Sequence, residues 1–146
     1  MKKIKLMRYT FKKNCKGYHS YGWYLYEDVI ELIKNTKKTV RIDDFLVDVN
    51  SQRLKLFIKN RTCNNCNIVG KWFSLDINRA DLRSNKQGKT LIKPHFNLYG
   101  IGDDGRLEMM TRDHIYPKSK GGTDTVDNYQ CLCMSCNMRK GADVID

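Results

Sequence analysis

The sequence lacks any apolar run long enough to span a membrane. In residues 1–8, Lys and Arg interrupt the apolar side chains, so the hydrophobic segment of a secretion signal is missing as well. We found no internal repeat beyond a pair of cysteine motifs and no low-complexity tract. We therefore expect a cytoplasmic protein with no membrane partner.

The sequence has fewer acidic residues than basic ones. Its 146 residues include 16 Asp and Glu and 27 Lys and Arg, which gives a net charge of +11. This excess predicts DNA or RNA as the partner, because each Lys or Arg that neutralises a phosphate releases condensed counterions. A solvated basic surface or a weak membrane-surface binder is the alternative. With 40% hydrophobic and 10% aromatic residues, the composition predicts a folded chain. Its length suits one modest core with or without an appendage, and excludes two large domains.

Four of the six cysteines form two Cys-x-x-Cys pairs, Cys63/Cys66 and Cys133/Cys136. In a reducing compartment such thiols remain available to metals, and two pairs together supply the four soft ligands of tetrahedral zinc. A disulfide framework or a redox pair is the alternative. The spacing therefore predicts a structural zinc site.

Two other cysteines have no partner at this spacing. We interpret Cys15 and Cys131 as packing residues or as a surface thiol. Because Cys131 lies two residues before Cys133, it is also an alternative ligand for the metal.

The hydrophobic pattern alternates between short helices and strands. In the basic region 1–50, interleaved aromatic residues fit either nucleotide stacking or the core of a small β-rich appendage. Ser51 is a candidate N-cap for a short helix that leads to the first cysteine pair. The expected helices are 26–33, 51–60 and 133–140, the expected strands are 40–49, 72–77, 96–101 and 107–111, and residues 78–94 are expected to form a loop.

Asp113, His114, Asn128 and Asn137 are polar side chains suited to phosphodiester hydrolysis. Asp113 and the amide oxygen of Asn137 can hold a hard cation such as Mg²⁺ or Mn²⁺. A neutral His114 can take the proton of an attacking water. Asn128 can fix a loop and present a carbonyl that orients the imidazole. Neighbouring side chains on a strand point to opposite faces, so Asp113 and His114 can share a site only where the strand ends or bulges.

Three segments, residues 111–122, 127–130 and 132–141, resemble the HNH endonucleases, whose catalytic unit is the ββα-metal fold. The Cys63/Cys66 pair extends the resemblance to the zinc-stapled subclass, and residues 93–100 are similar to small HNH nucleases of bacteriophages. The resemblance implies that Asp113 is a metal ligand, His114 the general base and Asn128 the orienting residue. Asn137 stands where the family has a final His or Asn, which implies a second metal ligand and the H-N-N variety.

We therefore predict an α+β protein with a basic N-terminal region at 1–50 and an HNH nuclease domain at 51–146. Structural Zn²⁺ would be held by Cys63, Cys66, Cys133 and Cys136, and catalytic Mg²⁺ or Mn²⁺ by Asp113 and Asn137. The expected partner is DNA, which a monomer or homodimer would cleave to give a nick or a double-strand break. If a phage or mobile element encodes the chain, it would act in the host cytoplasm. Two alternatives are a non-catalytic zinc ribbon that binds nucleic acid and a phage factor that binds a host protein. The basic residues expected to contact DNA are Arg112, Lys118, Lys120, Arg139 and Lys140.

Overall fold

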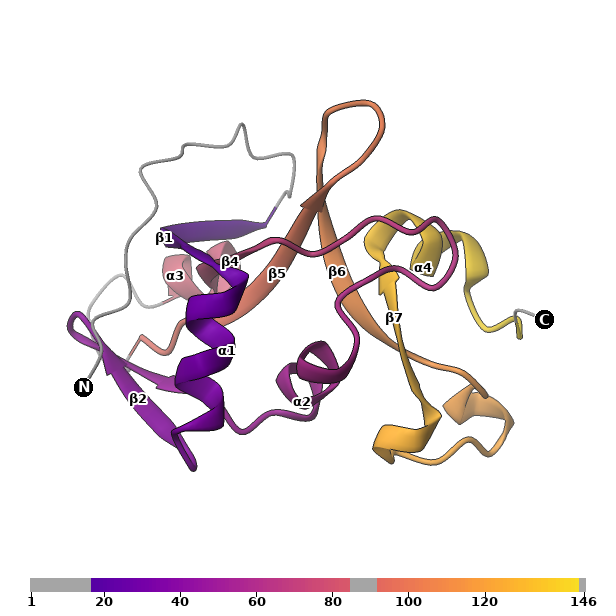
Figure 1. Ribbon diagram of the computed structural model, residues 1–146, viewed down its shortest axis with the longest axis horizontal. Helices are drawn as coiled ribbons and strands as arrows, with labels where there is room; N and C mark the ends of the chain where they lie inside the picture. Colours follow the sequence, from indigo (N-terminus) through magenta and orange to yellow (C-terminus); the bar gives the residue numbers. More distant parts are fainter. Residues whose placement is uncertain (1–16, 85–91, 145–146) are drawn as a thin grey trace.

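The computed structural model describes residues 17–84 and 92–144 (Figure 1). Cys15 and the part of the basic region before residue 17 lie outside these residues. Within them, no helix is long and apolar enough to cross a membrane. The elements in chain order are β1 (Tyr18–Leu25), α1 (Tyr26–Lys34), β2 (Thr39–Ile42), β3 (Phe45–Asp48), α2 (Gln52–Lys59), β4 (Trp72–Asn78), α3 (Arg79–Ser84), β5 (His95–Ile101), β6 (Leu107–His114), η1 (Lys118–Lys120), η2 (Val126–Asn128), β7 (Tyr129–Cys133) and α4 (Met134–Lys140).

A five-stranded antiparallel sheet in the order β1-β4-β5-β6-β7 organises the fold, and β2 with β3 forms a separate hairpin. The fold class is therefore α+β, as the sequence predicts. The middle of β4 is buried on both faces. Its apolar residues Phe73, Leu75 and Ile77 are buried on one face, and Ser74 and Asp76, which alternate with them, are buried on the other. Figure 1 shows α1 and β2 at one end of the molecule and β7 with α4 at the other.

The main core joins segments from both sides of residue 50. Phe73 on β4 stacks on Tyr26 of α1 with ring centroids 5.8 Å apart, and it also contacts Phe57 of α2 and Phe96 of β5. Val29 of α1 is fully buried in the same core. The division of the chain at residue 50 stays a prediction, but packing in the described residues crosses it.

Most of the expected elements are present. The α2 helix begins where Ser51 predicts, because the Ser51 hydroxyl accepts a hydrogen bond from the Leu54 N–H at 3.1 Å. The α1 helix and the strands β4 and β5 also match. The β6 strand runs three residues further than residues 107–111, so that His114 is its last residue.

Two local predictions are wrong. Residues 40–49 form a hairpin and not one strand, because the chain turns at Asp43, whose φ is +50°. Residues 78–94 contain a short helix, α3, before the undescribed residues 85–91. The side chain of Asn78 accepts a hydrogen bond from the Ala80 N–H at 2.8 Å and so starts that helix.

Phe73→Ala tests whether the core is shared. The substitution removes a fully buried ring that touches α1, α2 and β5, and we expect a loss of about 3–5 kcal/mol in the free energy of unfolding. Urea denaturation followed by near- and far-ultraviolet circular dichroism should give one coincident transition in the wild type. Separate transitions, with only one of them moved by Phe73→Ala, would contradict a shared core.

Candidate active site and cysteine cluster

Four cysteine side chains meet between the end of α2 and the start of α4. The sulfur atoms of Cys63, Cys66, Cys133 and Cys136 all lie within 4.8 Å of one another, and Cys66 Sγ is 3.7 Å from Cys133 Sγ. Figure 1 shows the chain after α2 crossing to α4 and then returning to β4. All but Cys66 are buried.

The cluster fits zinc in size and in chemistry. Zinc–sulfur bonds of about 2.3 Å in a tetrahedron place sulfurs about 3.8 Å apart, close to the Cys66–Cys133 separation. Each pair also makes the same turn: the N–H of Cys66 faces Cys63 Sγ, and that of Cys136 faces Cys133 Sγ, both at 3.5 Å. Burial opposes ionisation of Cys63, but backbone hydrogen bonds outweigh it and lower the pKa of this thiol to about 7.

Cys131 does not belong to the cluster. Its side chain is fully buried in the core, and burial raises the pKa of its thiol to about 12. Cys131 is therefore a packing residue. It does not replace Cys133 as a ligand, because the Cys133 sulfur lies in the cluster and the Cys131 sulfur does not.

Arg139, expected to contact DNA, lies against the cysteine cluster. Its guanidinium donates to Cys136 Sγ at 3.2 Å, and the side-chain amide of Asn65 donates to the same sulfur at 3.3 Å. A cation beside a cluster of thiolates offsets part of their negative charge.

Asp113 lies on the face of β6 that α4 covers. Its carboxylate accepts hydrogen bonds from Lys140 Nζ at 2.9 Å and from the side-chain amide of Gln130 at 3.0 Å. Two residues earlier on the same face, the Thr111 hydroxyl accepts from the side-chain amide of Asn137 at 2.8 Å. The strand and α4 therefore bring Asp113 and Asn137 to one face, and both offer the oxygen ligands that hard cations prefer.

The structure corrects the expectation for Lys140. Its side chain is only 2% exposed. The ammonium forms an ion pair with Asp113 and donates a hydrogen bond to the backbone carbonyl of His114 at 3.1 Å. A lysine so placed is not available to a DNA phosphate. It acts instead as the counter-ion of the buried Asp113 carboxylate.

His114 faces the loop between β6 and β7. Its ring meets the Tyr129 ring edge-on, and its Nε2 lies 2.7 Å from a carboxylate oxygen of Asp124. Asp124 also pairs with Lys118 at 2.7 Å, and hydrogen bonds from Lys118 and His114 lower the pKa of its carboxyl to about 2. Asp124 is thus ionised at neutral pH. Lys120 is exposed in η1.

The strand-end condition for Asp113 and His114 is met. Pairing between β6 and β7 runs without a shift up to His114 and Tyr129, where β6 ends. Asp113 therefore lies on the α4 side and His114 on the loop side of the same strand terminus. Lys140 links the two positions through the Asp113 carboxylate and the His114 carbonyl.

Asn128 fixes the loop that follows His114. Its side-chain oxygen accepts from the Tyr116 N–H at 2.9 Å, while its amide donates to the carbonyls of Tyr116 and Thr123 at 3.0 and 2.8 Å. Within the described residues, the hydrogen-bond partner of the His114 ring is Asp124 and not Asn128. Asn128 thus holds the loop, and the loop carries the acid that holds the imidazole.

The β6–β7 hairpin followed by α4 is a ββα unit with the polar residues at its open end. Residues 100–143 match the family model described as HNH endonuclease. This part of the chain therefore matches an HNH domain, and the family that it matches is one of nucleases. No curated protein and no solved structure matches the chain significantly.

Gly122→Ala tests whether the loop is closely fitted. A Cβ at Gly122 would lie 1.9 Å from the backbone oxygen of Tyr116, so the loop must move, and we expect a loss of about 1–3 kcal/mol in stability. Gly102→Ala is the control, since the nearest atom to its Cβ would be a side-chain oxygen of Asp104 at 3.1 Å, and the nearest backbone atom would be 3.9 Å away. Backbone amide NMR signals of residues 115–128 should shift in Gly122→Ala alone. Equal shifts in both variants would count against the fitted loop.

Proposed function

We propose that the chain is a metal-dependent endonuclease that hydrolyses DNA phosphodiester bonds at the end of β6. The observation that carries this proposal is the His114–Asp124 pair next to Asp113, within the segment that matches the HNH family. A lone histidine on a strand is commonly structural. A partly exposed histidine held by an ionised acid, beside a buried carboxylate, is suited to proton transfer.

His114 would serve as the general base. In the neutral imidazole one nitrogen carries a proton and the other accepts one. Nε2 faces the Asp124 carboxylate, and the tautomer with its proton on Nε2 would donate to that carboxylate. In this tautomer Nδ1 would accept the proton of an attacking water. Asp124 also stabilises the imidazolium that forms, and Asn128 keeps the loop that carries Asp124 in place.

Asp113 and Asn137 would hold Mg²⁺ or Mn²⁺, and their oxygen atoms suit these ions. When bound, the ion would neutralise charge on the phosphate and on the leaving 3′ oxygen. Asp113 is already neutralised by Lys140, so the Lys140 ammonium has to yield part of its contact when the ion binds. Lys140 thereby holds the carboxylate in place beforehand.

The cysteine cluster would hold a structural zinc ion. Its four ligands leave no open position for water, and binding of this kind contributes about 10–16 kcal/mol in zinc-finger peptides. Arg112, Lys118, Lys120 and Arg139 remain candidates for DNA contact. We also propose that a phage or mobile element encodes the chain and that it acts in the cytoplasm. It would act as a monomer or homodimer and would produce a nick or a double-strand break.

Plasmid cleavage by the wild type, His114→Ala and His19→Ala tests the function. Each protein would be assayed with Mg²⁺, with Mn²⁺ and with EDTA, and its fold and zinc content would be verified under each condition. We expect metal-dependent cleavage by the wild type and by His19→Ala, since His19 lies on β1 against Tyr21. Loss of the general base should slow His114→Ala about 10²–10⁴-fold.

Two results would contradict the proposal. A folded wild type that binds DNA but cleaves no substrate across varied sequences would favour a non-catalytic zinc ribbon. A folded wild type that does not bind DNA at moderate salt would favour a protein-binding role. Cleavage by His114→Ala at the wild-type rate would remove the assignment of the base.

Zinc removal gives a second prediction. Cys63→Ser should lose zinc and unfold, because one ligand of the cluster is missing. Cys131→Ala is the matched control: it removes a buried thiol outside the cluster and should keep one zinc per chain. Metal analysis and circular dichroism measure both effects. Zinc loss in Cys131→Ala with retention in Cys63→Ser would reverse the assignment.

A further inference from the structure

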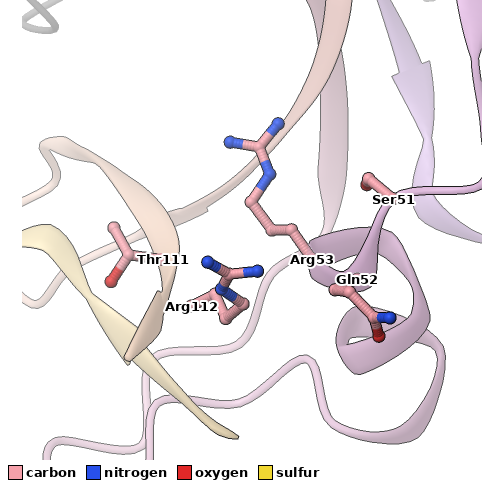
Figure 2. Close-up of a pocket in the computed structure, with 5 residues that line it drawn as sticks. All are labelled: Ser51, Gln52, Arg53, Thr111 and Arg112. Carbon is pink, nitrogen blue, oxygen red and sulfur yellow. The ribbon is translucent and has the colours of Figure 1, made fainter. Parts of the chain in front are cut away.

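A cleft of about 390 Å³ lies between the first turn of α2 and β6. Figure 2 shows its lining, with the Arg112 side chain between Thr111 and α2 and the Arg53 side chain beside it. The cleft is open to solvent, so a ligand could enter it without a rearrangement of the backbone. Its lining residues are Ser51, Gln52, Arg53, Thr111 and Arg112.

The lining is cationic and contains no carboxylate. Arg53 is held in place because its guanidinium donates to the Phe96 carbonyl at 2.7 Å. Arg112 is held by the Tyr129 ring, whose centroid is 4.5 Å from the guanidinium carbon. In residues 17–84 and 92–144, neither guanidinium forms an ion pair with an acidic side chain. Two fixed cations without a paired anion favour a negatively charged ligand.

Burial lowers the pKa of the Arg53 guanidinium, and the positive charge of Arg112 also lowers it, whereas Tyr18, Tyr99 and Asp76 act in the opposite direction. Both arginine side chains line the same cleft, so their positive charges repel each other. An anion placed between them would relieve that repulsion and could accept hydrogen bonds from both.

The cleft adjoins the candidate active site through two shared contacts. Thr111 lines it and is bonded to Asn137, one of the proposed metal ligands. Arg112 lies on the Tyr129 ring, which His114 also meets edge-on. An anion in the cleft would therefore lie near His114, the proposed general base, where a neighbouring phosphate of the same DNA strand could bind.

We propose that the cleft between α2 and β6 binds a DNA backbone phosphate next to the one that is cleaved, and that Arg53 and Arg112 are its ligands. This inference rests on the proposed nuclease function and adds a subsite to it. Such a contact positions the strand without reading its sequence. Arg53 and the first turn of α2 thereby become part of the DNA interface.

DNA binding measured without added Mg²⁺ or Mn²⁺, on protein whose zinc content is verified, separates this subsite from catalysis. Fluorescence anisotropy with a short duplex would compare the wild type, Arg112→Gln, Arg53→Gln and the double variant over a range of salt concentrations. We expect each single variant to bind about tenfold more weakly, as for a lost hydrogen bond to a charged group. The salt slope should fall by about one unit, and the double variant should lose less than the product of the two single effects because both arginines serve one phosphate.

Arg41→Gln is the matched control, because Arg41 is an exposed arginine on β2, away from β6 in Figure 1. It removes the same charge and should leave binding within about twofold of the wild type. Since Arg53 also bonds the Phe96 carbonyl, Arg53→Gln is interpreted only if its circular dichroism is unchanged, and otherwise Arg112→Gln decides.

A duplex with one uncharged methylphosphonate beside the mapped cleavage position tests the location. It should weaken wild-type binding, and it should leave binding by the Arg53→Gln/Arg112→Gln double variant unchanged. If both arginine variants bind like Arg41→Gln while the wild type binds and cleaves DNA, the subsite is wrong and the nuclease function stands. If the wild type neither binds nor cleaves DNA, the proposed function and the subsite fail together.

Discussion

The meeting of two cysteine pairs from distant parts of the chain is the constraint on which the site depends. Cys66 and Cys133 are 67 residues apart in sequence, yet their sulfurs approach to 3.7 Å. Four thiols at this spacing repel one another once ionised, so the arrangement is stable as thiolates only with a cation between them. With zinc bound, the turn after α2 and the start of α4 become one rigid junction at the end of the sheet.

Hydrogen bonds extend from that junction to the candidate active site. The Asn64 N–H, in the first cysteine turn, donates to the Cys131 carbonyl of β7 at 2.9 Å, and its side chain donates to Gln130 at 3.3 Å. Gln130 in turn donates to Asp113, which also pairs with Lys140 of α4. The carboxylate is thereby oriented from both sides by elements that the cysteine cluster joins. The cysteine cluster and the proposed active site are in this way parts of one hydrogen-bond network.

Sequence patterns predict the local features well. The Ser51 cap and the cysteine spacing specify their structures within a few residues, because short-range hydrogen bonds and ligand geometry decide them. Long-range pairing is not encoded in such patterns, so the sharing of one core by α1 and β4 and the burial of Lys140 were not predicted. The role of Asp124 was missed for the same reason: only the folded loop brings it to His114, ten residues earlier in the chain.

The chemistry of the cut ends tests the central claim most directly. If His114 activates water and the 3′ oxygen leaves, each cut carries a 3′ hydroxyl and a 5′ phosphate, so DNA ligase should reseal plasmid cut by the zinc-containing protein in Mn²⁺ without further treatment. The account predicts resealing to closed circles. Ends that ligase joins only after removal of a 3′ phosphate and phosphorylation of the 5′ end would contradict it, because they require a different nucleophile or leaving group.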